Sequence, residues 1–157
     1  MDKFPITLEG YERLEAELRA LKSKERPAVI KAIATAREHG DLSENAEYHA
    51  ARDRQAFIEG RVSELEEQIR GADVIDARKL KGKDVKFGAI VKVADEDTDE
   101  KTTFQIVGEY EADIKAGRLA ITSPLARALI GKRVNDSVEV TTPGGTKSYE
   151  IVSVRYR

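Results

Sequence analysis

The chain has 157 residues, of which 36% are charged and 40% hydrophobic, and it contains neither cysteine nor tryptophan. The absence of cysteine excludes disulfides, thiolate chemistry and cysteine zinc sites, and it favours a reducing, cytoplasmic location. Proteins that bind DNA without a partner usually carry a basic excess, whereas this chain has a net charge of −2. We therefore expect no autonomous sequence-specific DNA binding. We also expect no membrane partner, because the chain has neither a long uncharged run nor the pattern of a signal peptide.

The N-terminal residues predict a long helix with a disturbance at Pro27. Thr7 is a suitable N-cap before Leu8, and apolar residues then follow at coiled-coil spacing, namely Tyr11, Leu14, Leu18 and Leu21. Pro27 removes one backbone hydrogen bond, so the helix either kinks or breaks there. Because no capping residue directly precedes Pro27, we favour one kinked helix over residues 8–39, about 45 Å long.

A second helix is predicted to return alongside the first. Its apolar positions follow a spacing of four and three, namely Ile58, Val62, Leu65, Ile69 and Ala72. The helix ends near Gly71. Residues 1–76 are therefore predicted to form an antiparallel coiled-coil hairpin.

The bend between the helices, residues 40–45, contains two carboxylates. Gly40 suits a left-handed position just past a helix end, because it has no Cβ. Asp41 and Glu44 have the spacing of a capping box, in which each side chain accepts a hydrogen bond from the backbone of the other. The spacing alone favours capping and does not by itself indicate catalysis.

The composition changes near residue 78, after which residues alternate with period two. We expect strands over residues 83–93, 102–107, 137–142 and 147–156, with an acidic turn at residues 95–100. Ser123 and Pro124 open a short helix over residues 125–130, which Gly131 closes. The alternation changes phase between Ile151 and Val152, which indicates a β-bulge or burial on both faces. Residues 77–157 are thus predicted to form a small antiparallel α+β domain.

Three segments together resemble the Gre family of bacterial transcript-cleavage factors, and the resemblance covers essentially the whole chain. They are the tip, Ala36 to Arg52; Ile106-Val107-Gly108 with Glu111-Ala112-Asp113; and Ser123 to Lys132. The resemblance implies an α+β fold, with a coiled-coil hairpin over residues 1–76 and an FKBP-like domain over residues 77–157. It further implies that the hairpin enters the secondary channel of bacterial RNA polymerase while the C-terminal domain docks on the channel rim. There the tip would stimulate the polymerase to cleave the 3′ end of backtracked nascent RNA.

The resemblance also implies roles for particular residues. Asp41 and Glu44 would be donated to the polymerase active site as half of a Mg²⁺ site, with no metal bound by the free protein, because two carboxylates cannot supply six oxygen ligands. The chain would therefore be a cofactor of the polymerase, not an enzyme itself, and a monomer. Candidates for contact with RNA are Arg37, Arg52 and Tyr48. Candidates for docking on the polymerase are Ser123, Pro124, Leu125 and Arg127.

Several alternatives stay open at this stage. Arg37 and Arg52 are also compatible with a solvated coiled-coil flank, and Tyr48 either packs at the tip or approaches RNA. A Gre-like regulator could inhibit the polymerase without stimulating cleavage. We do not expect prolyl isomerase activity, because such pockets need large aromatic side chains and the chain has no tryptophan. A coiled-coil adaptor is the remaining alternative.

Overall fold

The computed structural model describes residues 3–40 and 44–157. Their contacts form two compact units, one of Tyr11–Gly71 and one that joins Ala72–Arg157 to the residues up to Gly10. This division differs from the sequence-based boundary at residues 76 and 77, because the chain before the hairpin packs with the C-terminal part. Within the described ranges, no helix is both long enough and apolar enough to cross a membrane.

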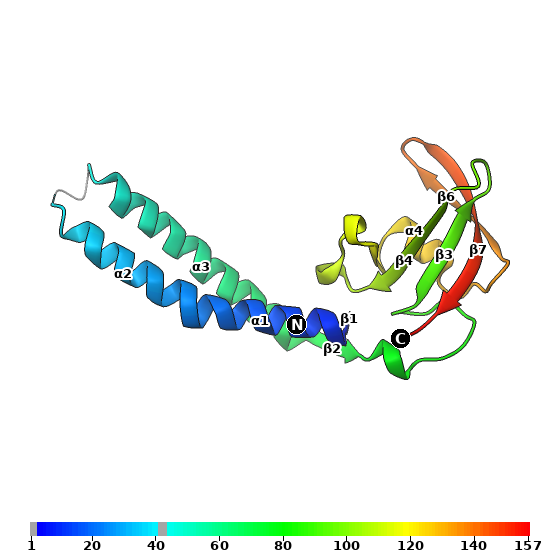
Figure 1. The fold of residues 1–157 in the computed structure, drawn as a ribbon, viewed down its shortest axis with the longest axis horizontal. Coiled ribbons are helices and arrows are strands. Elements are labelled where there is room, and N and C mark those ends of the chain that lie inside the picture. Colours follow the sequence, from blue (N-terminus) through cyan, green and yellow to red (C-terminus); the bar gives the residue numbers. More distant parts are fainter. Residues whose placement is uncertain (1–2, 41–43) are drawn as a thin grey trace. The chain divides into compact units, whose positions relative to one another are not determined.

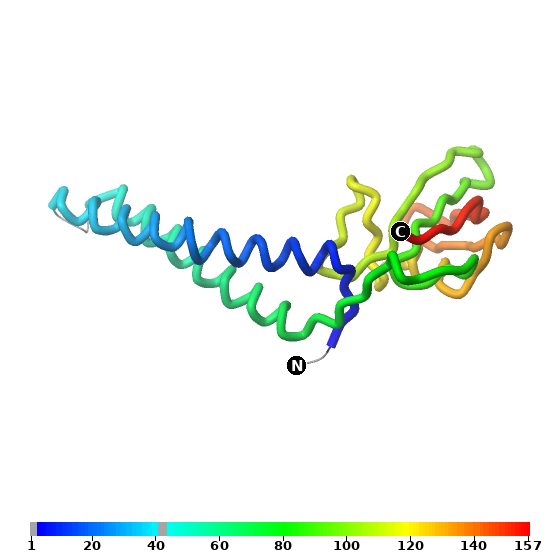
Figure 2. The backbone as a smooth tube through the Cα atoms, turned by 60° about the horizontal axis from the view of Figure 1, so that its bottom comes forward, coloured from blue at the N-terminus to red at the C-terminus, as the bar shows by residue number. Residues whose placement is uncertain are grey.

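The hairpin consists of helices α1 (Leu8–Ala20), α2 (Arg26–Arg37) and α3 (Ala46–Gly71), with α2 and α3 side by side (Figures 1 and 2). A π-helical segment, Leu21–Glu25, joins α1 to α2, and Arg26 N–H donates to the carbonyl of Leu21 five residues earlier. The residues flanking this segment have right-handed helical angles. The expected continuity of the helix through Pro27 is therefore confirmed, and a wide turn accommodates Pro27 without a break.

Apolar side chains fill the seam between the helices. Each buried Leu, Ile or Val contributes about 1.5–3 kcal/mol relative to an exposed one. Leu14 and Leu21 of the predicted seam are buried, whereas Tyr11 and Leu18 are half-buried. The buried apolar residues of the hairpin are Leu14, Leu21, Val29, Ile33, Ala36, Ile58, Val62 and Leu65.

Ion pairs flank this seam and match the antiparallel register of the helices. Arg61 holds the Glu17 carboxylate with two nitrogens, at 2.6 and 2.8 Å, and this hydrogen bonding lowers the pKa of Glu17. Arg26 lowers the pKa of Glu59 in the same way. Solvent screens such exposed pairs, so they add little to stability. Lys22–Glu66 and Glu25–Arg54 are further pairs between the two sides of the hairpin.

The C-terminal unit is built on a five-stranded sheet in the order β5-β4-β3-β7-β6 (Figure 1). The strands are β3 (Ile90–Asp95), β4 (Lys101–Val107), β5 (Arg118–Ala120), β6 (Ser137–Thr142) and β7 (Gly145–Arg155). The prediction of an antiparallel sheet was wrong at one edge, because β5 pairs parallel to β4. Two 3-10 turns, Glu109–Glu111 and Ile114–Ala116, carry the chain from β4 to β5.

The first predicted strand of this sheet was too long at its start. The structure begins β3 at Ile90, because residues 86–89 form a turn in which Gly88 has a φ of +87°. Val85 and Ala89 are nevertheless buried in the core, so the alternating apolar pattern reflects burial. The helix α4 (Pro124–Leu129) contributes Ala126 and Leu129 to the same core.

The predicted bulge in the last strand is confirmed. Lys92 pairs with Ser153 and Val93 pairs with Ile151, so Val152 is the extra residue. This extra residue explains why the apolar alternation of β7 changes phase after Ile151.

Two short strands were not predicted. β1 (Phe4–Thr7) pairs parallel to β2 (Ala72–Ile75), and a 3-10 turn, Ala77–Lys79, follows β2. Thr7 nevertheless caps α1 as expected, since its Oγ accepts from Gly10 N–H at 3.1 Å.

A buried carboxylate attaches β1 to the C-terminal sheet. Glu111 is only 7% exposed and accepts from the backbone N–H groups of Thr7 at 2.7 Å and Gly108 at 2.8 Å. The Thr7 hydroxyl also donates to Glu111. The rings of Phe4 and Tyr110 meet edge to face beside it, 4.9 Å apart. The Glu111 segment that supports the family resemblance therefore has a structural role.

Candidate functional site at the hairpin tip

Helix α2 ends in a tight turn. Glu38 N–H donates to the carbonyls of Thr35 and Ala36, and His39 N–H donates to the Ala36 carbonyl at 3.1 Å. Gly40 follows with a φ of +104°. A side chain at this φ would be strained, so the predicted left-handed glycine is confirmed.

Helix α3 begins at Ala46, with Asn45 as its N-cap. The Asn45 Oδ1 accepts from Tyr48 N–H at 3.0 Å, and its Nδ2 donates to the Ala36 carbonyl at 2.6 Å. Glu44 therefore precedes the cap and cannot be the third residue of a helix capped by Asp41. The capping-box interpretation of Glu44 was wrong, and Asp41 itself lies outside the described residues.

The Glu44 side chain is exposed in the bend before α3. Within residues 3–40 and 44–157 it forms no hydrogen bond or ion pair. Nor do these ranges contain a group of three or more His, Cys, Asp or Glu residues that could hold a metal ion. Glu44 is thus one of several exposed glutamates in the described part of the tip, and the paired half-site of Asp41 and Glu44 stays a prediction.

The structure brings two of the three candidates for RNA contact together. The guanidinium of Arg37, at the end of α2, lies 5.9 Å from the centre of the Tyr48 ring. Tyr48 is half-buried and also meets the His49 ring edge to face at 5.6 Å. Tyr48 therefore packs at the tip, as one of its two interpretations stated. Arg52 is exposed one turn further along α3.

The docking candidates lie at the start of α4 and differ in exposure. Ser123 Oγ caps this helix by accepting from Ala126 N–H at 3.3 Å, and Pro124 occupies the first turn, as predicted. Leu125 packs against the core of the sheet. Pro124 and Arg127 are exposed and available to a partner. Ser123 and Leu125 thus have internal roles that the sequence did not separate from docking.

Two family models match consecutive parts of the chain. The model described as "Transcription elongation factor, N-terminal" matches residues 4–74, and "Transcription elongation factor, GreA/GreB, C-term" matches residues 80–156. The chain belongs to the GreA/GreB family of transcription elongation factors. The resemblance found in the tip and in the two C-terminal segments is thereby confirmed.

Relatives of the GreA/GreB family match over the full length. "Transcription elongation factor GreA" of Rhodospirillum rubrum is 62% identical over 156 residues, which cover 99% of both chains. The protein of the same name from Ruegeria pomeroyi is 66% identical over 156 residues, again 99% of both chains. A solved structure of GreA factor homolog 1 from Thermus thermophilus is 26% identical, covers 98% of this chain and 99% of that one, and has a TM-score of 0.44.

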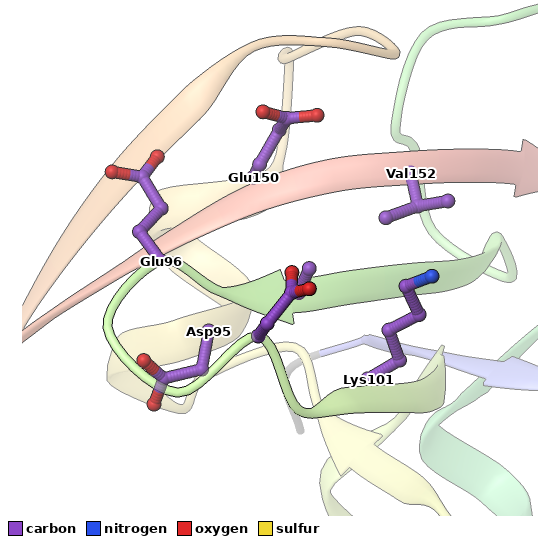
Figure 3. A pocket seen from close by; sticks show the side chains of 7 residues that line it. Asp95, Glu96, Lys101, Glu150 and Val152 are labelled. Carbon is purple, nitrogen blue, oxygen red and sulfur yellow. The ribbon is translucent and has the colours of Figure 1, made fainter.

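A pocket in the C-terminal unit of this family member lies beside the turn between β3 and β4 (Figure 3). Asp95 accepts from Asp97 N–H at 2.9 Å, and Glu96 accepts from the Ser137 hydroxyl at 2.6 Å, so both carboxylates stabilise local structure. A prolyl isomerase pocket would be expected to have aromatic side chains in its lining, and this lining contains none. The lining residues are Ala94, Asp95, Glu96, Asp99, Lys101, Glu150 and Val152.

Proposed function

We propose that this chain is a transcription elongation factor of bacterial RNA polymerase that stimulates cleavage of backtracked nascent RNA. The hairpin would enter the secondary channel, and its tip would act on the extruded 3′ end of the RNA within the elongation complex. Membership of the GreA/GreB family and full-length identity to proteins named as elongation factors support this proposal. Cleavage itself would remain an activity of the polymerase.

The observation that carries the proposal is the Glu44 carboxylate. It is exposed at the far end of a hairpin with an apolar seam, and within the described ranges it has no internal partner. A carboxylate used for capping would be bound to backbone N–H groups, but Asn45 performs that task. Among the described residues, nothing therefore competes with an outside group for Glu44.

The donor set fits a shared metal site better than an internal one. Mg²⁺ prefers about six oxygen ligands, and the described residues present no cluster that could supply them. Asp41 and Glu44 would hold part of the coordination sphere, and carboxylates of the polymerase would hold the rest. When bound, the ion would stabilise the negative charge that develops on the phosphate oxygens. Glu44 would orient the attacking water and accept its proton.

Other residues would place the tip and the protein. Arg37, supported by the Tyr48 ring, and Arg52 would contact RNA phosphates. Pro124 and Arg127 would contribute to docking on the channel rim, with Ser123 and Leu125 holding α4 in position. We place the protein in the bacterial cytoplasm as a monomer, without sequence-specific DNA binding of its own.

The deciding experiment measures RNA cleavage in a backtracked elongation complex with and without the protein. Asp41→Asn and Glu44→Gln remove a carboxylate charge but leave Asn45 as the cap. We expect each to lower stimulated cleavage by about 10²-fold or more, the scale of losing a positioned acid–base group. Both variants should still compete with wild type for the polymerase.

Glu47→Gln is the matched control, because Glu47 is an exposed glutamate in the first turn of α3. We expect it to retain nearly full activity. Full activity of both Asp41→Asn and Glu44→Gln would contradict the proposal. Inhibition of the polymerase by wild type without cleavage would support the Gre-like inhibitor instead.

A further inference from the structure

Asn45 makes two hydrogen bonds that reach different helices. Its Oδ1 accepts from Tyr48 N–H in the first turn of α3, and its Nδ2 donates to the carbonyl of Ala36 in the last turn of α2. The two contacts measure 3.0 and 2.6 Å, and Ala36 is 2% exposed. A single planar amide therefore joins the end of one helix to the start of the next.

The second of these bonds is not part of helix capping. A cap requires only an acceptor for the free N–H groups of the first turn, which Asp or Ser supplies as well as Asn. The carbonyl of Ala36 already accepts from His39 N–H within the turn at 3.1 Å. Glu38 N–H also donates to it, so the Asn45 amide is a further donor, from the other side of the bend, to an oxygen that the turn already uses. The chemistry thus calls for a side chain with both a donor and an acceptor.

Asn45 lies directly after Glu44, whose carboxylate is exposed at the tip. The backbone that carries Glu44 is therefore attached to both helices through one side chain. We propose that Asn45 is a positioning residue that fixes the Glu44 carboxylate relative to α2 and α3. This inference rests on the proposed function of Glu44, and it assigns to Asn45 a role beyond starting α3.

Two substitutions separate positioning from capping. Asn45→Asp and Asn45→Ser both keep an acceptor for Tyr48 N–H and both lose the amide donor to Ala36, but only Asp adds a negative charge. We expect both variants to melt close to wild type. With both, the protein concentration that gives half-maximal cleavage should be unchanged, whereas the maximal cleavage rate should fall at least tenfold. Asn45→Ala, which loses both bonds, should also reduce thermal stability.

Several outcomes would overturn the positioning role. One is a maximal rate that stays at the wild-type value in both variants. Another is a maximal rate that falls for Asn45→Asp alone, because that loss would reflect the added charge. A rise in the half-maximal concentration without a change in rate would also overturn it, because it would indicate a docking role.

Amide hydrogen exchange by NMR tests the two bonds without any polymerase. In Asn45→Asp and Asn45→Ser, the His39 amide should exchange faster than in wild type, because the turn that ends α2 is no longer joined to α3 and opens more often. The Tyr48 amide should be unchanged, because its cap remains. Equal exchange at His39 in variants and wild type would overturn the inference. If exchange changes as expected but wild type stimulates no cleavage, the proposed function fails while the link between the helices stands.

Discussion

Gly10 and Gly60 both lie within helices, but one site is buried and crowded and the other is exposed and open. Gly10, in α1, is buried, and a Cβ added there would overlap the Glu111 carboxylate. Glu111 cannot withdraw without losing its bonds to Thr7 and Gly108. Gly60, in α3, is exposed, and no atom lies within 4 Å of the position of its Cβ. Helix propensity alone treats the two glycines alike.

We therefore expect opposite effects from the same substitution. Gly60→Ala should raise the free energy of unfolding by roughly 0.5–1 kcal/mol, because alanine loses less backbone entropy. Gly10→Ala should lower it by roughly 1–3 kcal/mol, as overpacked sites do. Urea unfolding followed by circular dichroism measures both values. Stabilisation by Gly10→Ala would show that Glu111 is not held in place as the structure indicates.

The tip shows how far residue patterns could predict the site. The family resemblance pointed to the acidic segment and to Arg37, and the glycine turn followed from backbone sterics alone. The prediction that Asp41 caps the second helix was wrong, because Asp and Asn are equally good N-caps and Asn45 lies only four residues further on. The bond from Asn45 to Ala36 joins residues nine apart, and no local pattern encodes such a contact. An Asn directly before a predicted helix is the signal that could have been weighed.

At the scale of elements, periodic patterns were reliable where one environment persists along a segment. The continuity of the helix through Pro27, the α4 helix with its Ser-Pro start and the bulge at Val152 all followed from local chemistry. β1, β2 and β5 have only three or four residues each, too few for a period to show. Their pairing depends on distant partners, and the start of β3 was misplaced because burial continues through a turn at Gly88.

The ion pairs of the hairpin predict a specific pH dependence. Arg61 holds the pKa of Glu17 below its ordinary value of 4.5. A carboxylate with a lowered folded-state pKa stabilises the fold above its unfolded pKa and loses that effect as pH falls through the folded value. Glu17→Gln should thus cost at most about 1 kcal/mol at neutral pH. This cost should vanish at a pH below the lowered pKa of Glu17.

The measurement compares urea unfolding of Glu17→Gln and wild type from neutral to acidic pH. Glu12→Gln is the control, because Glu12 is an exposed glutamate of the same helix without an ion pair in the described part of the chain. It should show no pH-dependent difference from wild type. A difference for Glu17→Gln that persists at low pH would indicate lost packing instead of a lost charge interaction.

At the scale of the whole molecule, the family models and the contacts divide the chain differently. The models meet between residues 74 and 80, close to the change in composition. The contacts instead join β1 to the C-terminal part, through Thr7 and Glu111. A fragment cut at the sequence boundary therefore keeps the β1–β2 pair but loses the Glu111 carboxylate that accepts from Thr7.

This division predicts the behaviour of two fragments. Residues 1–76 retain the hairpin seam, the β1–β2 pair and the tip with Glu44 and Asn45. We expect this fragment to be helical by circular dichroism and to stimulate cleavage weakly, because it lacks the proposed docking residues of α4. Residues 79–157 retain all five strands of the larger sheet and α4. We expect this fragment to compete with the intact protein for the polymerase without any cleavage.

Two further measurements make the fragment experiment decisive. Glu44→Gln introduced into residues 1–76 should abolish the weak stimulation, whereas Glu47→Gln in the same fragment should not. The chemistry would then depend on the tip carboxylate and not on the hairpin as a whole. Stimulation of cleavage by residues 79–157 would place the chemistry outside the tip. Failure of this fragment to compete would remove α4 and its sheet from the docking surface, because every docking candidate lies on it.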